Sequence, residues 1–417
     1  MWTAPWFIAI LLAIVVPYAV KAVASWLNLG ALESSLPEDC SDIYDAEAYS
    51  RSQRYTRESI RLDLVQSTLE CVGLLIFWLA GGFSWLDRFV RSFHLADIGS
   101  GLVGLSLMFL AGQALALPFS LYDTFVLEAR YGFNKTTLAT FIADRLKGLA
   151  LGFALGLPVV ALVLWLFLNV PHAWLWSWGT ATAFSLILTF IAPKYLFPLF
   201  NKFTPLPDGE LKDAIHRMAA DCQFPLGEIS VIDGSRRSTK ANAFFAGFGK
   251  TKRIALYDTL VSRHSVPELV AVLAHEVGHF KRHHIWQLLV LGVLQTGILF
   301  FLLDQSLGHP QVFHAFGVAM PSLWLGFVLF AILYQPLALP MGMGLAALSR
   351  KNEFEADAFA TQTVGTPRAL FEALKKLARD NLANLTPHRF YVLLHHSHPP
   401  IRERLAALAA HQDSAKK

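Results

Sequence analysis

The sequence predicts a mostly α-helical protein that crosses a membrane several times, and three observations support this fold class. Of the 417 residues, 54% are hydrophobic and only 16% are charged, and the mean hydropathy is +0.44. A soluble protein of this composition would expose too much apolar surface, so the bilayer must be its main solvent. Apolar stretches of about 20 residues, long enough to span the hydrocarbon core, predict about seven transmembrane helices. They cover residues 6–27, 64–86, 102–121, 149–170, 174–192, 285–303 and 320–345.

The third observation is that positive charge alternates between successive loops. Residues 28–63, 122–146, 194–284 and 349–417 hold 31 of the 35 Lys and Arg residues, whereas the other loops hold only Arg88 and Arg91. Cytoplasmic loops retain Lys and Arg, so the amino terminus is expected outside and the carboxyl terminus inside. The basic residues form no single cluster, which argues against nucleic acid as a partner. Cys40, Cys71 and Cys222 are scattered, so neither a disulfide framework nor a cysteine metal site is expected.

Polarity divides the chain into four parts. A membrane block with spans one to five (1–193) precedes a cytoplasmic α+β segment (194–284), then spans six and seven (285–348), then a cytoplasmic tail (349–417). In the α+β segment, the pattern predicts an amphipathic helix from about Pro207 that stops before Pro225. ISVIDGS and RIALYDTL predict two short strands, and alternation at residues 241, 243 and 245 suggests an edge strand between them.

The stretch that follows carries a recognisable metal motif on a predicted helix. Ser265 is a candidate N-cap, and Glu268 three residues later completes a capping box. Further along, His275, Glu276 and His279 form H-E-x-x-H, which places both imidazoles on one helical face. Two neutral imidazoles at this spacing can hold one Zn²⁺ while the glutamate acts on water as a general base.

A catalytic zinc site needs a third protein ligand, and the best candidate is in SRKNEFEADAFA after the seventh span. Glu353 and Asp357 are four residues apart and share a helical face, whereas Glu355 is expected to face solvent. Glu353 would then ligate zinc, and Asp357 would accept the second N–H of a ligating histidine. The alternative is a surface helix whose acids pair with Arg350 and Lys351.

Two more histidines follow the motif directly. His283 extends the same helical face, but about 12 Å of helical rise separates it from His275, too far to share one ion. The sequence therefore favours a polar collar at the membrane surface for His283 and His284, together with Lys281 and Arg282.

Together these residues resemble the integral-membrane CAAX prenyl endopeptidases, seven-span zinc metalloproteases that remove the last three residues of prenylated proteins. The resemblance covers nearly the whole chain. Besides HEVGH at 275–279 and SRKNEFEADAFA at 349–360, it rests on four stretches. They are YDTFVLEARYGFNKTT at 122–137, PLFNKFTPLPDGELK at 198–212, STKANAFFAGFGKTKRIALYDTLV at 238–261 and SHPPIRERL at 397–405.

The resemblance implies a chamber between the spans and a gluzincin-like α+β zinc protease unit at its cytoplasmic end. It implies that His275, His279 and Glu353 bind one Zn²⁺, that Glu276 is the general base and proton shuttle, and that Asp357 supports the site.

Four further residues are implied with specific alternatives. Asn242 and Ala243 would bind substrate backbone at the edge strand, although Asn242 could be an ordinary strand-end residue. His398 would bind substrate or stabilise the oxyanion, or lie exposed in its Pro-rich turn. Arg404 would pair with a carboxylate of the site and contact substrate, or lie on the surface of the last helix.

The predicted function is that of a zinc-dependent membrane metalloendopeptidase. It would cut near the C-terminus of CAAX-like, possibly prenylated peptides, with membrane lipid as a further partner. One alternative is a membrane-protein quality-control protease without prenyl specificity. A second is a protease that cuts within the membrane, which the charges directly after HEVGH disfavour. A third is a non-catalytic chambered protein with a structural zinc. The Ala-rich and Leu-rich composition predicts a bacterial inner membrane protein, and the loop charges predict that its active site faces the cytoplasm.

Overall fold

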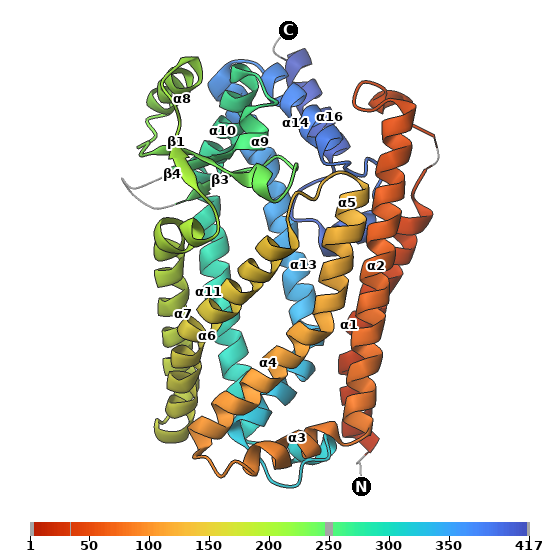
Figure 1. Cartoon of the computed structure of the whole chain (residues 1–417), viewed down its shortest axis with the longest axis vertical. Helices are drawn as coiled ribbons and strands as arrows, with labels where there is room; N and C mark the ends of the chain where they lie inside the picture. Colours follow the sequence, from red (N-terminus) through yellow and green to blue (C-terminus); the bar gives the residue numbers. More distant parts are fainter. Residues whose placement is uncertain (1–3, 34, 247–252, 415–417) are drawn as a thin grey trace.

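The computed structural model describes residues 4–33, 35–246 and 253–414, and it is a long helical body with a small sheet at one end (Figure 1). Within these residues, seven helices are long and apolar enough to cross a membrane, which confirms the predicted number. They are α1 (Ala4–Gly30), α2 (Ala46–Leu79), α4 (Asp97–Tyr122), α6 (Leu138–Asn169), α7 (Ala173–Ile191), α11 (His284–Leu307) and α13 (Leu323–Val364).

Short segments continue two of these helices towards the sheet. They are η2 (Asp123–Leu127) and α5 (Glu128–Arg130) after α4, and η3 (Ala192–Leu196) and η4 (Phe197–Leu199) after α7. The two chain termini lie at opposite ends of the body (Figure 1), as an odd number of crossings requires.

The second predicted span is wrong at its carboxyl end. The apolar stretch runs to residue 86, but α2 ends at Leu79. Gly81 has φ +76°, a left-handed conformation that favours glycine, and it starts the separate helix α3 (Gly82–Arg91). Hydrophobicity alone does not register this turn, because both helices are apolar on at least one face.

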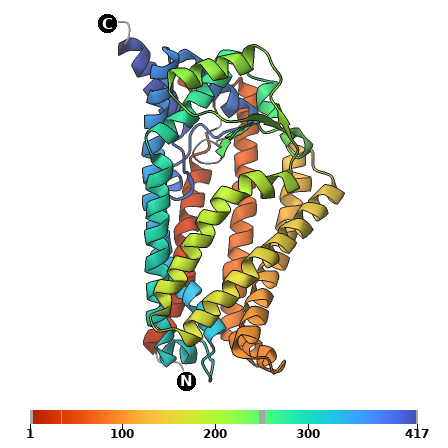
Figure 2. The same cartoon turned by 90° about the vertical axis from the view of Figure 1, so that its left-hand side faces the viewer.

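The seven long helices form a closed ring of neighbours. Each contacts the next in the order α1, α2, α4, α6, α7, α11 and α13, and α13 returns to contact α1. Only 0 to 33% of the most apolar part of each span is buried, so the helices pack along their flanks rather than into one solid bundle. They spread apart in both perpendicular views (Figures 1 and 2). The seven spans therefore surround a common interior, which is the arrangement that the predicted chamber requires.

An apolar cluster closes the ring at the end opposite the sheet, where α3 lies (Figure 1). Ile10, Trp78, Phe83 and Trp324 are buried there, together with residues of α12 (Pro310–Ala315). Gly104 of α4 allows a close approach to α13, since a Cβ at this position would lie 2.5 Å from the Trp324 indole. This packing joins the start of α13 to α4. The buried residues at this end of the ring are mainly apolar.

The sheet has four strands in the order β1-β2-β4-β3. β1 (Phe203–Pro205) pairs antiparallel with β2 (Ile229–Ile232), β2 pairs parallel with β4 (Arg253–Tyr257), and β4 pairs antiparallel with β3 (Ala243–Ala246). The expected edge strand is thus present as β3. β1 was not predicted, because three residues ending in a proline carry too little pattern.

Helices from distant parts of the chain surround this sheet. The α+β segment supplies α8 (Glu210–Asp221), η5 (Gly234–Arg236), α9 (Asp258–Val261) and α10 (Val266–Lys281). The tail supplies α14 (Arg368–Asp380), α15 (Arg389–His395) and α16 (Ile401–Ser414). One apolar core joins these helices to the loop between α1 and α2, which contains η1 (Glu38–Cys40). There the Tyr44 hydroxyl donates to the Ala378 carbonyl at 2.7 Å.

α13 joins the membrane ring to the helices around the sheet. Its 42 residues extend about 63 Å at 1.5 Å per residue, roughly twice the hydrocarbon thickness. The predicted boundary between residues 348 and 349 therefore falls inside one continuous helix, and the tail begins as its extension. Because the membrane part of α13 and the turn that carries Glu353 belong to one helix, the position of Glu353 follows from that of the membrane ring.

Candidate active site

The first two candidate ligands lie on α10, and the start of that helix is fixed as predicted. Ser265 and Glu268 form the capping box, in which the Ser265 backbone N–H donates to Glu268 Oε2 at 2.9 Å. Lys376 of α14 lies 2.7 Å from Glu268 Oε1. Burial works against the Glu268 anion, but the bonds from Lys376 and Ser265 outweigh it and lower the pKa of this carboxyl. The cap therefore ties the motif helix to the tail.

α10 approaches α13 closely at Gly278, one residue before His279. A Cβ on Gly278 would lie 3.1 Å from the Ala356 Cα and 3.2 Å from the Ala356 carbonyl oxygen. The absence of a side chain thus lets the two helix backbones come together. This contact sets the motif histidines opposite Glu353.

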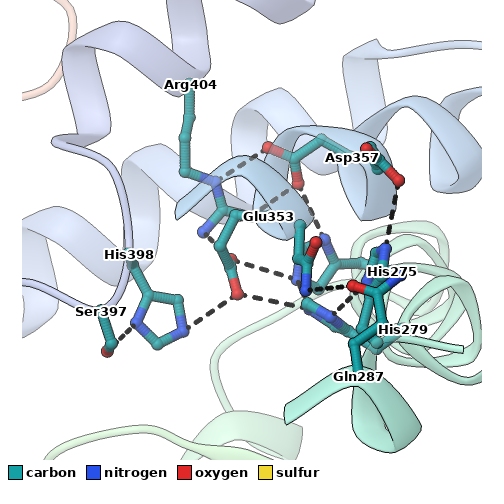
Figure 3. Close-up of polar contacts among 11 residues, drawn as sticks. His275, His279, Gln287, Glu353, Asp357, Ser397, His398 and Arg404 are labelled. Carbon is teal, nitrogen blue, oxygen red and sulfur yellow. Dashed lines mark hydrogen bonds and ion pairs between the residues drawn. The ribbon is translucent and has the colours of Figure 1, made fainter. Parts of the chain in front are cut away.

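The three candidate ligands converge from these two helices (Figure 3). Their ligand atoms all lie within 4.8 Å of one another. Nε2 of His275 and Nε2 of His279 are 3.2 Å apart, and His279 Nε2 is 3.3 Å from Glu353 Oε1. His275 and Glu353 are 7% and 3% exposed, so the cluster is shielded from bulk water.

The donor set fits a divalent metal better than it fits an ion-free polar cluster. Two ring nitrogens that face each other cannot both offer lone pairs without a shared cation or proton. Glu353 Oε2 is buried and accepts no hydrogen bond from the described residues, although the Arg404 guanidinium lies 3.2 Å away. Two imidazoles and one carboxylate form the zinc ligand set of several metallopeptidases. His275, His279 and Glu353 are the residues that would hold the ion.

Asp357 lies behind His275, where the sequence placed it. Its Oδ1 is 2.8 Å from His275 Nδ1, the ring nitrogen that points away from Glu353. Burial disfavours the charged imidazolium of His275, but the contacts with Asp357 and Glu353 outweigh it and raise its pKa to about 9. Asp357 is therefore positioned to fix the orientation of the His275 ring.

Arg404 on α16 is buried, with only 7% of its surface exposed, so it is not a surface arginine. It forms a two-pronged ion pair with Asp357: Nε donates to Oδ2 at 2.8 Å and Nη2 donates to Oδ1 at 2.6 Å. Burial opposes the charge, yet the Asp357 contacts raise the pKa of Arg404 further. Its guanidinium thus holds the carboxylates of Asp357 and Glu353 in place, and a role in substrate binding stays a prediction.

A cavity of about 340 Å³ opens beside this cluster. Its wall includes Asn242, Glu276 and His398, so three further predicted residues come to the same space. His398 Nε2 lies 3.3 Å from Glu353 Oε1, and the His398 side chain is 62% exposed. Ala243, the remaining predicted residue, begins β3, where its backbone pairs with Leu256.

Sequence reasoning missed two parts of the site. Leu370, Leu374 and Leu377 of α14 form an apolar wall of the cavity, and their helical spacing was the available signal. The sequence predicts His284 to be part of a surface collar, but its side chain is 2% exposed and contacts His279. No local pattern distinguishes it from the exposed His283.

Fold and site together define a multi-pass membrane metallopeptidase. Two family models match in succession: "CAAX prenyl protease N-terminal, five membrane helices" over residues 26–202 and "Peptidase family M48" over residues 205–412. The chain belongs to the membrane-integral CAAX prenyl protease family of the M48 peptidases.

Similar proteins match over almost their full length. A CAAX prenyl protease 1 homolog of Oryza sativa is 34% identical, with 97% of each chain covered. CAAX prenyl protease 1 of Saccharomyces cerevisiae is 34% identical, with 90% of this chain and 89% of the relative covered. The crystal structure of S. mikatae Ste24p superposes with a TM-score of 0.92 at 32% identity, covering 97% of this chain and 99% of that one.

Proposed function

We propose that this chain is a zinc-dependent endopeptidase that cuts near the C-terminus of CAAX-like, prenylated peptides or other membrane-associated peptides. One observation carries the proposal. The ligand atoms of His275, His279 and Glu353 meet within 4.8 Å beside a cavity that Glu276 also lines. Glu353 connects this cavity to α13, the last membrane helix, so a peptide anchored in the membrane can bring its chain end to the site.

The residues of the chain then have distinct tasks. Zn²⁺, when bound, supplies Lewis acidity towards water and the scissile carbonyl. Glu276 takes the proton from the attacking water and gives it to the leaving amine. The edge strand that begins at Ala243 offers backbone groups to an extended substrate, with Asn242 beside it. His398 donates to the carbonyl oxygen as negative charge develops there.

The substrate proposal rests on the relatives and on the shape of the interior. The relatives are named CAAX prenyl proteases. A second cavity of about 620 Å³ shares His398, Ile401 and Arg404 with the first and extends to Tyr55 and Ser59 of α2. The two cavities together give a peptide room beside the metal ligands, and the preference for a prenylated substrate is supported by the names of the relatives.

Replacing Glu276 with Gln tests the mechanism. Loss of the base should lower kcat by about 10²- to 10⁴-fold, while zinc per chain stays unchanged because no ligand is altered. Peptide cleavage and metal content of the purified protein measure the two effects. Glu372→Gln, on the exposed face of α14, is the matched control and should cut normally. Full activity in the Glu276 variant would remove this residue from the mechanism. Bound zinc without peptidase activity in the parent would favour a structural metal.

A paired substrate comparison tests prenyl specificity. A farnesylated C-a-a-X peptide and its unlipidated twin are given to the parent protein in the same detergent. The farnesylated peptide should show the higher kcat/KM, because its apolar tail can be buried between the apolar spans while the peptide reaches the metal ligands. Equal values would instead favour the quality-control protease without prenyl preference.

We also propose that the active site faces the cytoplasm, with membrane lipid around the spans. The support is the charge asymmetry of the loops, since the sheet end carries the segments rich in Lys and Arg. A bacterial inner membrane remains the location that the Ala-rich and Leu-rich composition suggests.

A further inference from the structure

His279 has two ring nitrogens, and the structure gives each a different neighbour. Nε2 faces His275 and Glu353, the other two candidate ligands. Nδ1 lies 3.1 Å from Nδ1 of His284. The same division occurs at His275, whose Nε2 faces the cluster and whose Nδ1 faces Asp357. Each motif histidine is therefore supported from behind, but one by a carboxylate and the other by a second histidine.

His284 in turn has a partner for its second nitrogen. Its Nε2 lies 3.3 Å from Glu355 Oε2. Glu355 is 40% exposed, and its other oxygen lies 3.6 Å from the Lys351 ammonium. The contacts thus run in series from the ligand cluster, through His279 and His284, to a carboxylate at the protein surface.

The proton positions along this series follow from metal binding. A ligating His279 must offer the lone pair of Nε2, so its proton sits on Nδ1. That N–H donates to His284 Nδ1, which must then be the unprotonated nitrogen of a neutral ring. The His284 proton sits on Nε2 and donates to Glu355 Oε2. Each of the two contacts then has one donor and one acceptor.

The backbone explains how His284 reaches this place. α10 ends at Lys281. The backbone of His283 has φ +60°, a left-handed conformation that is uncommon for residues other than glycine. The turn starts α11 in a new direction with His284 as its first residue. His284 is 2% exposed, whereas a straight continuation of α10 would have carried it past the cluster.

We propose that His284, held by Glu355, is the positioning residue that fixes the tautomer and ring orientation of His279 for metal binding. This rests on the metal site of the proposed function. Asp357 and His284 are then equivalent supports for the two motif histidines. Such supports commonly change metal affinity about 10- to 100-fold when removed.

The experiment measures zinc affinity of the full chain in detergent by competition with a chromogenic chelator. His284→Phe keeps a planar ring but removes the acceptor, and it should bind zinc about 10- to 100-fold more weakly. His284→Asn places its amide oxygen close to the position of Nδ1 and should restore most of the affinity. His283→Asn is the matched control, because asparagine tolerates the left-handed conformation and His283 is not among the converging ligand atoms.

Cobalt substitution adds a readout that a purely structural role would not change. The visible absorption spectrum of the Co²⁺ protein reports the ligand geometry, so it should shift in His284→Phe and match the parent in His283→Asn. If His284→Phe does not fold, Glu355→Leu on the partly exposed side of α13 carries the test. It should weaken zinc binding by a few-fold relative to Glu355→Gln, which keeps an acceptor for His284.

The outcomes separate the two claims. A parent protein that binds no zinc contradicts the proposed function itself. Normal zinc affinity and an unchanged cobalt spectrum in His284→Phe, or in Glu355→Leu where the former does not fold, contradict the positioning role alone.

Discussion

At the scale of single residues, the buried charge of Arg404 decides the local electrostatics. Its guanidinium makes two short bonds to Asp357 and lies 3.2 Å from Glu353. Both carboxylates are 3% exposed, and Arg404 is the arginine that contacts both of them in this region of low dielectric, beside the histidines. A single arginine therefore favours the ionised form of both the candidate ligand Glu353 and its neighbour Asp357.

Replacing Arg404 with Gln should destabilise the protein and the site together. Breaking a buried pair from one side typically costs about 3–5 kcal/mol. Arg404→Lys should recover only part of this, because one ammonium cannot make the forked contact. Thermal unfolding in detergent and zinc per chain measure both effects, with the exposed Arg389→Gln as control. A Gln variant that melts and binds zinc like the parent would contradict this reading.

At the scale of elements, the crossing of α10 and α13 assembles the site. Each helix alone carries an incomplete ligand set, and the close approach at Gly278 completes it. Because α13 continues from the membrane ring to Glu353 as one helix, the packing of its membrane part sets where Glu353 lies. Helix packing at one glycine links the membrane and catalytic halves.

Gly278→Ala should push the two helices apart. The added Cβ meets backbone atoms of Ala356, which cannot rotate away, and such overpacking typically costs about 1–3 kcal/mol. Zinc affinity should fall at least about tenfold, since a small displacement separates ligands on different helices. Gly292→Ala in α11 is the control, because no atom lies within 4 Å of its added Cβ. Equal chelator competition by the two variants would rule out a role for the close approach.

At the scale of the whole molecule, the catalytic unit is held to the membrane block by polar contacts as well as by the shared core. Arg237, just before the edge strand, donates to both carboxylate oxygens of Asp144 on α6, at 2.8 and 3.1 Å. It also donates to the Phe200 carbonyl and to Asn201 Oδ1. One side chain thus joins α6, the segment after η4 and the turn between β2 and β3.

Arg237→Gln should loosen this junction without touching the metal ligands. We expect faster limited proteolysis of the α+β segment and a several-fold loss of kcat/KM, while zinc per chain stays the same. The neighbouring Arg236 is exposed, and Arg236→Gln is the matched control. Unchanged proteolysis and activity in Arg237→Gln would show that the apolar core alone holds the unit in place.

Features that depend on short stretches of chain could be read from the sequence. Seven apolar runs, the strands on both sides of residues 238–246, and the capping box before H-E-x-x-H all reflect local periodicity or spacing. The pairing of Glu353 with a motif 74 residues earlier could also be proposed, because so few acids follow the seventh span with the right spacing. Most of these features depend only on residues close together in the chain, so a single sequence is enough to predict them.

Only the tertiary structure decided which polar side chains turn inward. His283 and His284 are adjacent and identical, yet a left-handed turn at the first leaves the second buried against His279. Arg404, at a distance in the chain, became the partner of Asp357 through the docking of α16 on α13. The closure of seven helices into a ring is likewise set by packing between distant segments. Such contacts depend on how distant elements pack against each other in space. The local pattern of residues around each partner is the same whether or not the contact forms.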